Sequence, residues 1–372
     1  TDFTEAGIPA IHYGQIYTFY GLSTETTKSF VSQDTAKKLK KVNTGDVVIT
    51  NTSENLDDVG KALVYLGKEQ AVTGGHATIF KPREGIIGKY FAYFTQTNSF
   101  YNEKRKYSKG TKVIDVSASD MAKIIIPIPC PNNPEKSLAI QLEIVRILDK
   151  FTALTAELTA ELTAELNMRK KQYNYYRDQL LSFDEDEVEW KMLGDLGENL
   201  DSKRKPITSG LREAGSIPYY GASGIVDYVK DYIFDGDFLL ISEDGANLLA
   251  RNTPIAFSIS GKSWVNNHAH VIKFDSYAER RYVEYYLNSI DLAPYISGAA
   301  QPKLNKKNLE SIRIPNPSPE DKERIVSILD KFDALTNSIN EGLPREIELR
   351  QKQYEYYRDL LFSFPRPETA SN

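Results

Sequence analysis

The side chains that could do chemistry in this sequence are amides, hydroxyls and clustered lysines and arginines. These side-chain types suit recognition of nucleic acid. Lys and Arg cluster at 104–112, 203–205 and 303–307, with Tyr and Asn interleaved. Basic groups hold phosphates, whereas amides and hydroxyls pair with base edges. A solvated lysine loop is the alternative interpretation of each cluster. The candidate DNA-binding residues are Tyr13, Gln15, Asn51, Tyr101, Asn102, Lys104, Arg105, Lys106, Lys109, Lys112, Lys203, Arg204, Lys205, Ser223, Asn247, Asn267, Lys303, Asn305, Lys306 and Lys307.

The aromatic stretch 12–20 supplies two of these candidates. Its Tyr and Phe residues predict a half-buried strand with most of the rings in the core. We expect DNA contact from this stretch only for Gln15 and Tyr13.

Motifs for making or breaking bonds are missing from the sequence. It has no Asn/Asp-Pro-Pro-Tyr/Phe run of amino-methyltransferases and no Gly-x-Gly-x-x-Gly, and Ala256 stands where a phosphate loop needs glycine. Glu189-Trp190-Lys191 matches half of a nuclease metal site, but Asp184 and Asp186 are too close in sequence to face it across a hairpin. We interpret that segment as an acidic linker, and predict no catalytic residue, no bound cofactor and no metal.

Cysteine and histidine are scarce. A single Cys130 excludes a disulfide framework, and one Cys with four His is too few for a zinc cluster of the usual spacing. A reducing cytoplasm is therefore expected. No apolar run approaches the ~18 residues of a membrane helix, so no membrane span is expected. His76 and His268 fall at corresponding positions, and we expect each to be a buried imidazole bonded to backbone rather than a catalytic group.

An internal duplication organises the chain. Residues 147–155 recur at 328–336 and residues 171–178 recur at 352–359, both 181 positions later. Chance similarity between helical sequences would rarely match over such a length without a gap. The duplication therefore predicts two copies of one architectural unit.

Two variable domains alternate with the two repeated segments. Short Val, Ile, Tyr and Phe runs at 46–50, 88–94 and 238–242 predict strands between turns. The predicted fold class is α+β. The predicted limits are 1–136 for the first β-rich domain, 137–183 for the first helix, 184–317 for the second β-rich domain, 318–364 for the second helix and 365–372 for a flexible tail.

The repeated segments carry the apolar stripe of a coiled coil. Apolar residues of the first copy alternate by four and three positions, and Thr-Ala-Glu-Leu repeats over 155–166 then advance leucines by four. In the second copy, Gly342 and Pro344 should interrupt the helix. A helix over 137–183 would extend about 70 Å, so we expect it to pair with its twin. The residues expected in helix packing and partner binding are Phe151, Leu158, Leu162, Leu166, Tyr173, Tyr176, Phe332, Leu335, Tyr354 and Tyr357.

These features resemble the DNA-specificity subunits of Type I restriction-modification enzymes, over essentially the whole chain. The resemblance rests on the duplication, Ile-Leu-Asp-Lys-Phe at 147 and 328, Lys-Gln-Tyr-x-Tyr-Tyr-Arg-Asp at 171 and 352, the Thr-Ala-Glu-Leu repeats, and 298–304. It implies two target-recognition domains that each read half of a split DNA site. It also implies that two long helices, forming an antiparallel coiled coil with a pseudo-two-fold repeat, hold these domains apart.

The same resemblance implies partners that carry the chemistry. Two methyltransferase (modification) subunits would bind largely through the helices, followed by restriction/translocase subunits. S-adenosylmethionine, ATP and Mg²⁺ would belong to those partners, and this chain would be a non-catalytic scaffold.

Two features depart from the family pattern. The chain begins at Thr1 and lacks a counterpart to 188–194 in its first half, so we expect residues to precede it. The net charge is +3 over 1–136 but -5 over 184–317, within a total of -5. An acidic second domain suggests that partner subunits supply much of the affinity for phosphates.

Given this resemblance, the Thr-Ala-Glu-Leu repeats are expected to set the spacing between the two half-sites, besides simply favouring a helix. Each unit adds about 6 Å of rise and ~40° of rotation, against roughly 3.4 Å and ~35° for one base pair. Deleting 159–162 is therefore expected to shorten the tolerated DNA spacer by about one base pair.

Two alternative functions remain compatible with the residues. The chain could be a coiled-coil adaptor that binds only proteins, without sequence-specific DNA binding. It could also be the DNA-reading fragment of a fused restriction-methylation enzyme.

Overall fold

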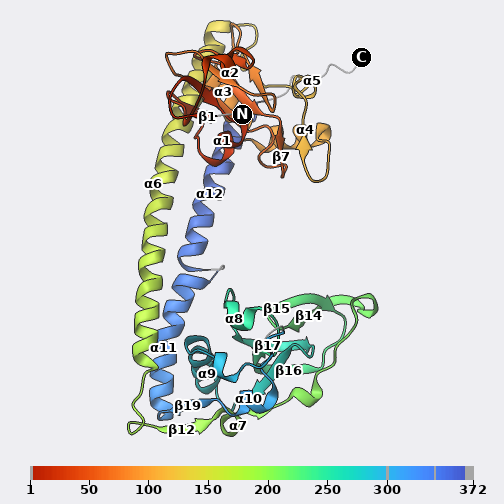
Figure 1. Ribbon diagram of the computed structural model, residues 1–372, viewed down its shortest axis with the longest axis vertical. Helices are drawn as coiled ribbons and strands as arrows, with labels where there is room; N and C mark the ends of the chain where they lie inside the picture. Colours follow the sequence, from red (N-terminus) through yellow and green to blue (C-terminus); the bar gives the residue numbers. More distant parts are fainter. Residues whose placement is uncertain (1–2, 299–300, 339–340, 365–372) are drawn as a thin grey trace. The chain divides into compact units, whose positions relative to one another are not determined.

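The computed structural model describes residues 3–298, 301–338 and 341–364, so the predicted tail at 365–372 lies outside the described residues. The chain divides into two compact units, Thr1–Leu162 with Glu346–Asn372, and Thr163–Arg345. Each unit combines helices with sheets (Figure 1), which confirms a mixed helix-and-sheet fold.

The first unit contains a five-stranded sheet in the order β1-β4-β2-β9-β5, a four-stranded sheet in the order β10-β6-β8-β3, and the pair β11-β7. The strands are β1 Phe3–Thr4, β2 Ile8–Ile11, β3 Ser23–Thr24, β4 Ser29–Val31, β5 Lys40–Val42, β6 Val47–Thr50, β7 Thr52–Ser53, β8 Ala62–Tyr65, β9 Ala71–Thr73, β10 Ala77–Phe80 and β11 Ile114–Asp115. The helices before the long repeat helix are α1 Tyr13–Thr18, α2 Gln33–Lys37, α3 Gly88–Phe94, α4 Asn98–Tyr107 and α5 Ala118–Met121.

The second unit is built on a six-stranded sheet in the order β13-β18-β16-β17-β14-β15 and on the pair β12-β19. The strands are β12 Glu189–Met192, β13 Glu198–Asn199, β14 Ala214–Gly221, β15 Gly224–Val229, β16 Phe234–Ser242, β17 Ala256–Val265, β18 Ala269–Lys273 and β19 Arg313–Asn316. The helices are α7 Leu193–Leu196, α8 Asn247–Ala250, α9 Tyr277–Ser289 and α10 Lys306–Glu310, with 3-10 turns η1 Asp201–Lys203, η2 Ser209–Leu211 and η3 Ala293–Tyr295.

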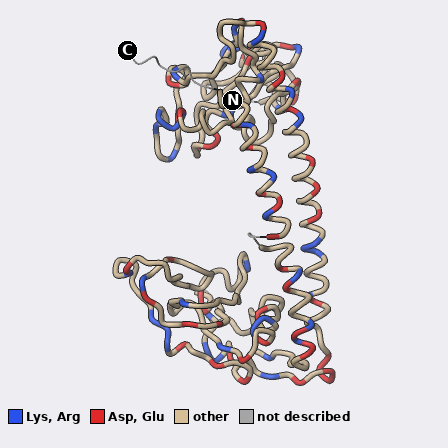
Figure 2. Tube along the Cα trace, turned by 180° about the vertical axis from the view of Figure 1, so that it is seen from behind, with Lys and Arg blue, Asp and Glu red and all other residues tan. Residues whose placement is uncertain are grey.

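Within the described residues, the repeated segments contain the helices α6 Pro134–Leu180, α11 Pro319–Asn337 and α12 Gly342–Leu361. Figure 2 shows acidic and basic residues interspersed along them. The predicted interruption of the second copy is confirmed, since α11 ends at Asn337 and Gly342 has a φ of +77°. Pro344 lies in the first turn of α12, where a missing N–H costs no helical hydrogen bond, and so does not break that helix.

Within each unit, α6 packs against the second copy through a pair of rings that the repeat relates. Phe151 stacks on Tyr357 with 5.8 Å between centroids in the first unit, and Tyr176 stacks on Phe332 at 5.7 Å in the second. A shift of 181 positions converts one pair into the other. The duplicated sequence therefore builds the same contact twice.

The same repeat fastens each domain to its helix through one aspartate. Asp149 accepts hydrogen bonds from Tyr93 Oη (2.8 Å) and Lys89 Nζ (2.8 Å) of α3. Its counterpart Asp330 accepts from the side chains of Tyr285 and Arg281 of α9. The Asp of the Ile-Leu-Asp-Lys-Phe motif thus joins α3 to α6 and α9 to α11.

The substitution Asp330→Asn is expected to destabilise the second unit by about 1–3 kcal/mol, because the buried Tyr285 and the partly buried Arg281 lose a charged acceptor. Chemical denaturation measures the effect, with the exposed Asp275→Asn as the matched control. Equal unfolding free energies for the two variants would contradict this role.

Two predicted strands are in fact helices. Residues 88–94 form α3 because Tyr90, Tyr93 and Phe94 pack on Ile144 and its neighbours in α6, whereas the other face of α3 packs on the β6-β8 sheet. A helix that is buried on both faces lacks the polar stripe that would reveal it in the sequence.

The stretch 12–20 contains α1 rather than a strand, because the His12 side chain accepts from Gly14 N and starts a helix. The predicted strands at 46–50 and 238–242 are confirmed as β6 and part of β16. Glu189-Trp190-Lys191, interpreted as a linker, lies in β12 and pairs with β19.

Candidate nucleic-acid interface

Three loops of the first unit meet where strand β6 ends. Thr50 Oγ1 donates to Tyr13 O (3.2 Å), and Asn51 N donates to His76 O (2.9 Å). Val116 N donates to Asn51 O (3.0 Å), which brings in the segment after the basic loop that follows α4. Tyr13, Asn51 and the basic loop, far apart in sequence, therefore border one place on the domain.

The second unit repeats this junction where strand β16 ends. Glu243 N donates to His268 O (2.9 Å), as Asn51 N does to His76 O, and both partners lie 192 positions later. The Ser242 hydroxyl donates to Ala222 O, the counterpart of the bond from Thr50 to Tyr13. The two recognition junctions, defined as these loop ends around Asn51 and His76 and around Glu243 and His268, thus share one construction.

The sheets explain why the junctions coincide. β2 runs parallel to β9 in the first unit, and β14 runs parallel to β17 in the second. Strands β6 and β16 each pair antiparallel with the strand that follows the histidine, β10 and β18. One strand framework therefore carries two unrelated sets of loops.

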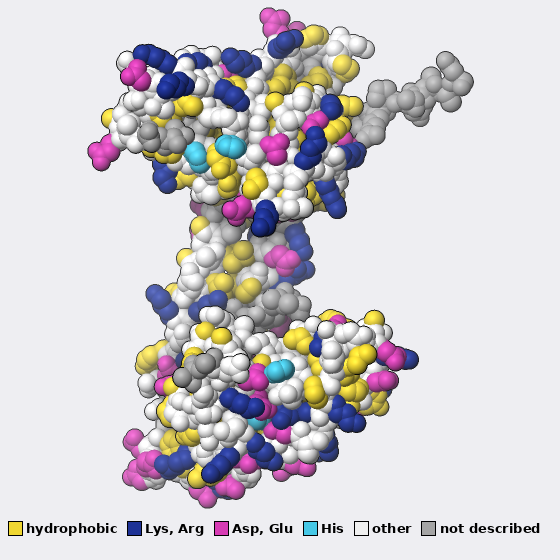
Figure 3. All heavy atoms as spheres, turned by 45° about the vertical axis from the view of Figure 1, so that its right-hand side comes forward, with side chains coloured by type: hydrophobic (Ala, Val, Ile, Leu, Met, Phe, Trp, Pro, Cys, Tyr) yellow, Lys and Arg dark blue, Asp and Glu magenta, His cyan; other side chains and the backbone are white. Residues whose placement is uncertain are grey.

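Most of the predicted contact residues are exposed. Ser223, Asn267 and Lys303 are exposed at the second junction, and Lys205 N donates to Val265 O beside it. Lysine and arginine side chains reach the surface of each unit, and histidines lie among them (Figure 3). The other exposed candidates are Asn102, Arg105, Lys106, Lys109, Lys112, Lys203, Lys306 and Lys307.

Several predicted contact residues make hydrogen bonds within their own domain. Gln15 Nε2 donates to Ser29 Oγ (2.7 Å), and Thr78 Oγ1 donates to Asn51 Oδ1 (2.7 Å). Asn247 bonds the backbone of Thr253 through both its amide atoms, and Asn305 caps α10.

Lys104 is 4% exposed, and its ammonium group donates to Val59 O. Burial lowers the pKa of Lys104 to about 8. Its prediction as a phosphate contact is unsupported by this geometry, because reaching DNA would expose a packed side chain. Tyr101 is half-buried beside it, with the Lys104 ammonium 5.2 Å from its ring centroid.

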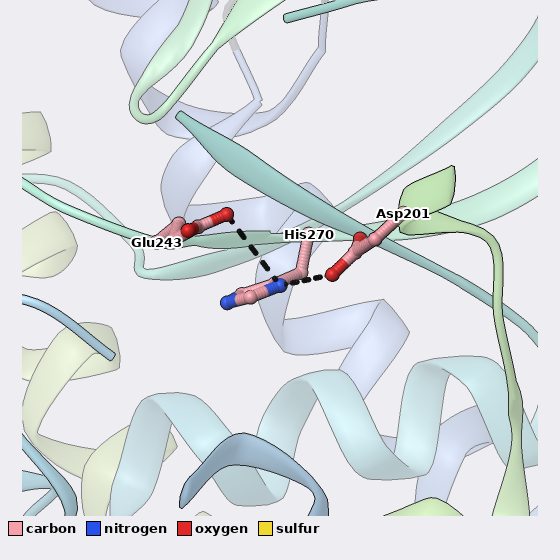
Figure 4. A group of neighbouring side chains, drawn as sticks. All are labelled: Asp201, Glu243 and His270. Atoms are coloured by element: carbon pink, nitrogen blue, oxygen red, sulfur yellow. Dashed lines mark hydrogen bonds and ion pairs between the residues drawn. The ribbon is translucent and has the colours of Figure 1, made fainter. Parts of the chain in front are cut away.

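Beneath the second junction lies a buried charge network of Asp201, Glu243 and His270 (Figure 4). His270 Nδ1 is 2.6 Å from Asp201 Oδ2, and its Nε2 is 2.7 Å from Leu304 O. Arg204 Nη1 lies 2.6 Å from Glu243 Oε2. The guanidinium group of Arg204, predicted to bind DNA, is therefore bonded inside the domain.

The donor set of this network would suit a cation, but two cationic side chains already satisfy it. Besides Arg204, Lys303 Nζ lies 3.1 Å from Glu243 Oε1. Burial acts to raise the pKa of Glu243, but the hydrogen bond from Arg204 and nearby positive charges hold the pKa below its usual range. Since Leu304 N also donates to Glu243 O (2.7 Å), the network fastens the loop before α10.

The substitution Glu243→Gln is expected to cost about 1–3 kcal/mol of unfolding free energy near neutral pH. A carboxylate with a lowered folded pKa stabilises the fold above its unfolded pKa of about 4. That stability is lost as pH falls through the lower folded pKa. Denaturation of both proteins from pH 7 to pH ~3 should therefore bring their stabilities together. A difference that stays constant over this range would contradict the assignment.

The two conspicuous histidines are placed differently from the prediction. His76 and His268 are exposed rather than buried, and their side chains bond Thr52 Oγ1 (3.1 Å) and Asp244 (2.9 Å). The buried imidazole is His270. His268 lies in the turn before β18, whereas His270 lies within the buried part of that strand, and no residue pattern marks this boundary.

The helices expose tyrosines that the sequence prediction did not select. Tyr175 and Tyr356, related by the 181-residue shift, are 62% and 64% exposed. The predicted Tyr173 and Tyr354 are half-buried, and Tyr176 and Tyr357 stack on phenylalanines. The repeat itself was the available signal, since Tyr175 and Tyr356 recur like their neighbours. Leu158, Leu162, Leu166 and Leu335 are half-buried.

The family model of the Type I restriction modification DNA specificity domain matches the chain twice, over residues 11–168 and 185–349. This chain belongs to that family. The two matched stretches correspond to the two copies seen in the sequence and in the paired junctions. Throughout the described ranges, each helix of this family member is too short or too polar to cross a membrane.

Relatives in the family include two Escherichia coli proteins. The EcoR124I/EcoR124II specificity subunit is 51% identical over 270 residues, which cover 66% of this chain and 65% of the relative. The EcoprrI specificity subunit is 46% identical over 244 residues, covering 64% and 59%. The match thus spans less than two thirds of the length of these relatives.

Solved structures of the family share the fold at low identity. A structure described for complex assembly and conformational transition of the type I R-M system aligns with a TM-score of 0.63 and 14% identity, covering 95% of this chain and 91% of that chain. The HsdS subunit from Thermoanaerobacter tengcongensis aligns with a TM-score of 0.53 and 15% identity, covering 95% and 89%. These likenesses concern the fold alone.

Proposed function

We propose that this chain is the non-catalytic DNA-specificity subunit of a Type I restriction-modification complex, with one recognition junction reading each half of a split target. The single observation that carries the proposal is the repeated junction, in which matched bonds hold different side chains. A shared framework with variable loops is what two readers of different sequences require.

In this proposal, exposed lysine and arginine side chains hold the protein in register on the DNA backbone. The side chains at the junctions discriminate between base sequences. Arg105, Lys109 and Lys203 are suited to phosphates, whereas Ser223 and Asn267 are suited to base edges. Lys104 and Arg204 are left out, because their charged groups are bonded inside their domains. The remaining exposed candidates keep the roles predicted from the sequence.

We further propose that the repeated helices form an antiparallel coiled coil that sets the spacing of the half-sites. The stacked pairs Phe151 with Tyr357 and Tyr176 with Phe332 support this role. The domain limits 1–136, 137–183, 184–317 and 318–364 stay part of the proposal. So does a cytoplasmic location.

Two methyltransferase subunits, and then restriction/translocase subunits, are the proposed protein partners. S-adenosylmethionine, ATP and Mg²⁺ would be held by those partners. The matched positions of Tyr175 and Tyr356 support two equivalent docking sites, one for each methyltransferase subunit.

Titration of the assembled complex with duplex DNA in rising salt tests the proposal against a protein-only adaptor. A DNA reader loses affinity steeply as salt rises, since phosphate contacts release counterions. Salt-independent binding or absence of binding would favour the adaptor. Methyl transfer by the isolated chain would instead favour the fragment of a fused enzyme.

A further inference from the structure

We propose that His268 and His76 are specificity-determining residues, each reading one base edge in the half-site of its own domain. The inference rests on the proposed DNA-reading function and deepens it. It concerns the imidazole edges that the two recognition junctions hold toward solvent.

The two histidines occupy one equivalent place. Each lies in the turn between two strands of the common framework, His76 before β10 and His268 before β18. In each case the main-chain oxygen of the histidine accepts a 2.9 Å bond from the residue that follows the central strand. The ring Nδ1 then bonds the next side chain along, Thr52 or Asp244.

The main-chain bond separates the role of the ring from that of the fold. Because the carbonyl groups of His76 and His268 join the loops, the imidazoles are not needed to close the junctions. The His268 side chain is 51% exposed, whereas the ring of His270, two residues later, is 1% exposed and bonded on both sides. The exposed ring therefore has a free edge that the interior does not use.

Neighbouring groups fix the direction of each ring. His268 Nδ1 lies 2.9 Å from both carboxylate oxygens of Asp244. In the first unit, Thr52 holds His76 Nδ1, and the Tyr13 ring lies 5.1 Å from the His76 ring. A side chain that is already held in one orientation loses less conformational entropy when it binds a base edge.

The ligand chemistry follows from what each partner can accept. A carboxylate only accepts, so Asp244 receives the Nδ1 proton of His268 and leaves Nε2 as the free edge. On the neutral ring Nε2 is an acceptor, which fits the exocyclic amino group of adenine or cytosine in the major groove. Thr52 can donate or accept, so the His76 edge can present either character.

The two junctions are therefore expected to differ in stringency. His268, with one tautomer held by Asp244, should select an amino-bearing base sharply at one position. His76 should tolerate more bases at its equivalent position. Asp244→Asn presents both an amide donor and a carbonyl acceptor to Nδ1, so Nε2 is no longer restricted to accepting and the base preference at this position should relax toward that of His76.

The test is selection of bound duplexes from a random pool by the full chain assembled with its methyltransferase subunits, for the wild type, His268→Ala, Asp244→Asn and His76→Ala. His268→Ala should lose about tenfold or more of its preference at one position of one half-site. His76→Ala should affect one position of the other half-site. Asp244→Asn should relax the base preference at the His268 position, so that more than one base is accepted there.

Controls separate the inference from folding and from the proposed function. Asp275→Asn, at an exposed carboxylate of the second unit, should return the wild-type motif, and thermal unfolding should be similar for all variants. Should folding of His268→Ala be impaired, His268→Gln keeps a polar side chain and should still alter one position. A wild-type assembly without a split motif overturns the proposed function. A wild-type motif that both histidine variants leave unchanged overturns this inference alone.

Discussion

Deletion of Thr159–Leu162 from α6 is expected to shorten the selected DNA spacer by about one base pair while both half-site sequences stay the same. The four residues form one Thr-Ala-Glu-Leu unit within the continuous helix Pro134–Leu180. Removing them takes away about 6 Å of helix and ~40° of rotation, which resembles one base pair in rotation and exceeds it in rise.

The expected loss for the original site is large, because a complex with the wrong spacing places only one domain in register. Each mismatched base pair costs about 1–3 kcal/mol, so losing several contacts of one half-site weakens binding by at least about a hundredfold. Affinity for a spacer shortened by one pair should be restored to within about tenfold of the wild-type complex.

A length-preserving variant controls for altered helix chemistry. Replacing Thr159 and Glu161 by Ala keeps four residues and high helix propensity, and should leave the spacer unchanged. If the deletion variant selects the original spacer with its original affinity, the length of α6 does not set the spacer.

Loss of both methyltransferase subunits is the expected result of substituting Tyr175 and Tyr356 by Ser together. Exposed tyrosines at the centre of an interface often contribute about 2 kcal/mol or more each, which is roughly thirtyfold in affinity. Each ring also lies against the next tyrosine, with centroids 5.4 Å apart, so the pairs present preformed aromatic surfaces.

Single substitutions make the prediction sharper. Tyr175→Ser or Tyr356→Ser alone should leave a complex that holds one methyltransferase subunit, because the 181-residue shift makes the two sites equivalent. Native mass spectrometry or light scattering measures the stoichiometry. Tyr228→Ser, a 52% exposed tyrosine of β15, is the matched control. If the double variant still binds both methyltransferase subunits, these rings are not part of the interface.

The duplication was the most informative property of the sequence. It predicted the long helix α6 and the packing of Phe151 and Tyr176 between the helices, whereas Gly342 and Pro344 predicted the interruption of the second copy. Strands β6 and β16 were also predicted, since each is a short β-branched or aliphatic run between turns.

The errors have physical causes that a single sequence conceals. Helix α3 lacks a polar face because a sheet and α6 cover both of its sides. Lys104 and Arg204 have the residue types of surface cations. In the folded domains, however, the backbone carbonyl of Val59 binds Lys104 and the carboxylate of Glu243 binds Arg204, and both partners come from distant segments. His76 and His268 were matched correctly, whereas their exposure depends on loops that meet only in the folded domain.

The most direct test of the central claim is sequencing of duplex DNA selected from a random pool by the full chain assembled with methyltransferase subunits. The account predicts a split motif of two half-sites separated by a spacer of fixed length, with binding that weakens steeply as salt rises. Binding without a motif, or no binding to DNA, would contradict it.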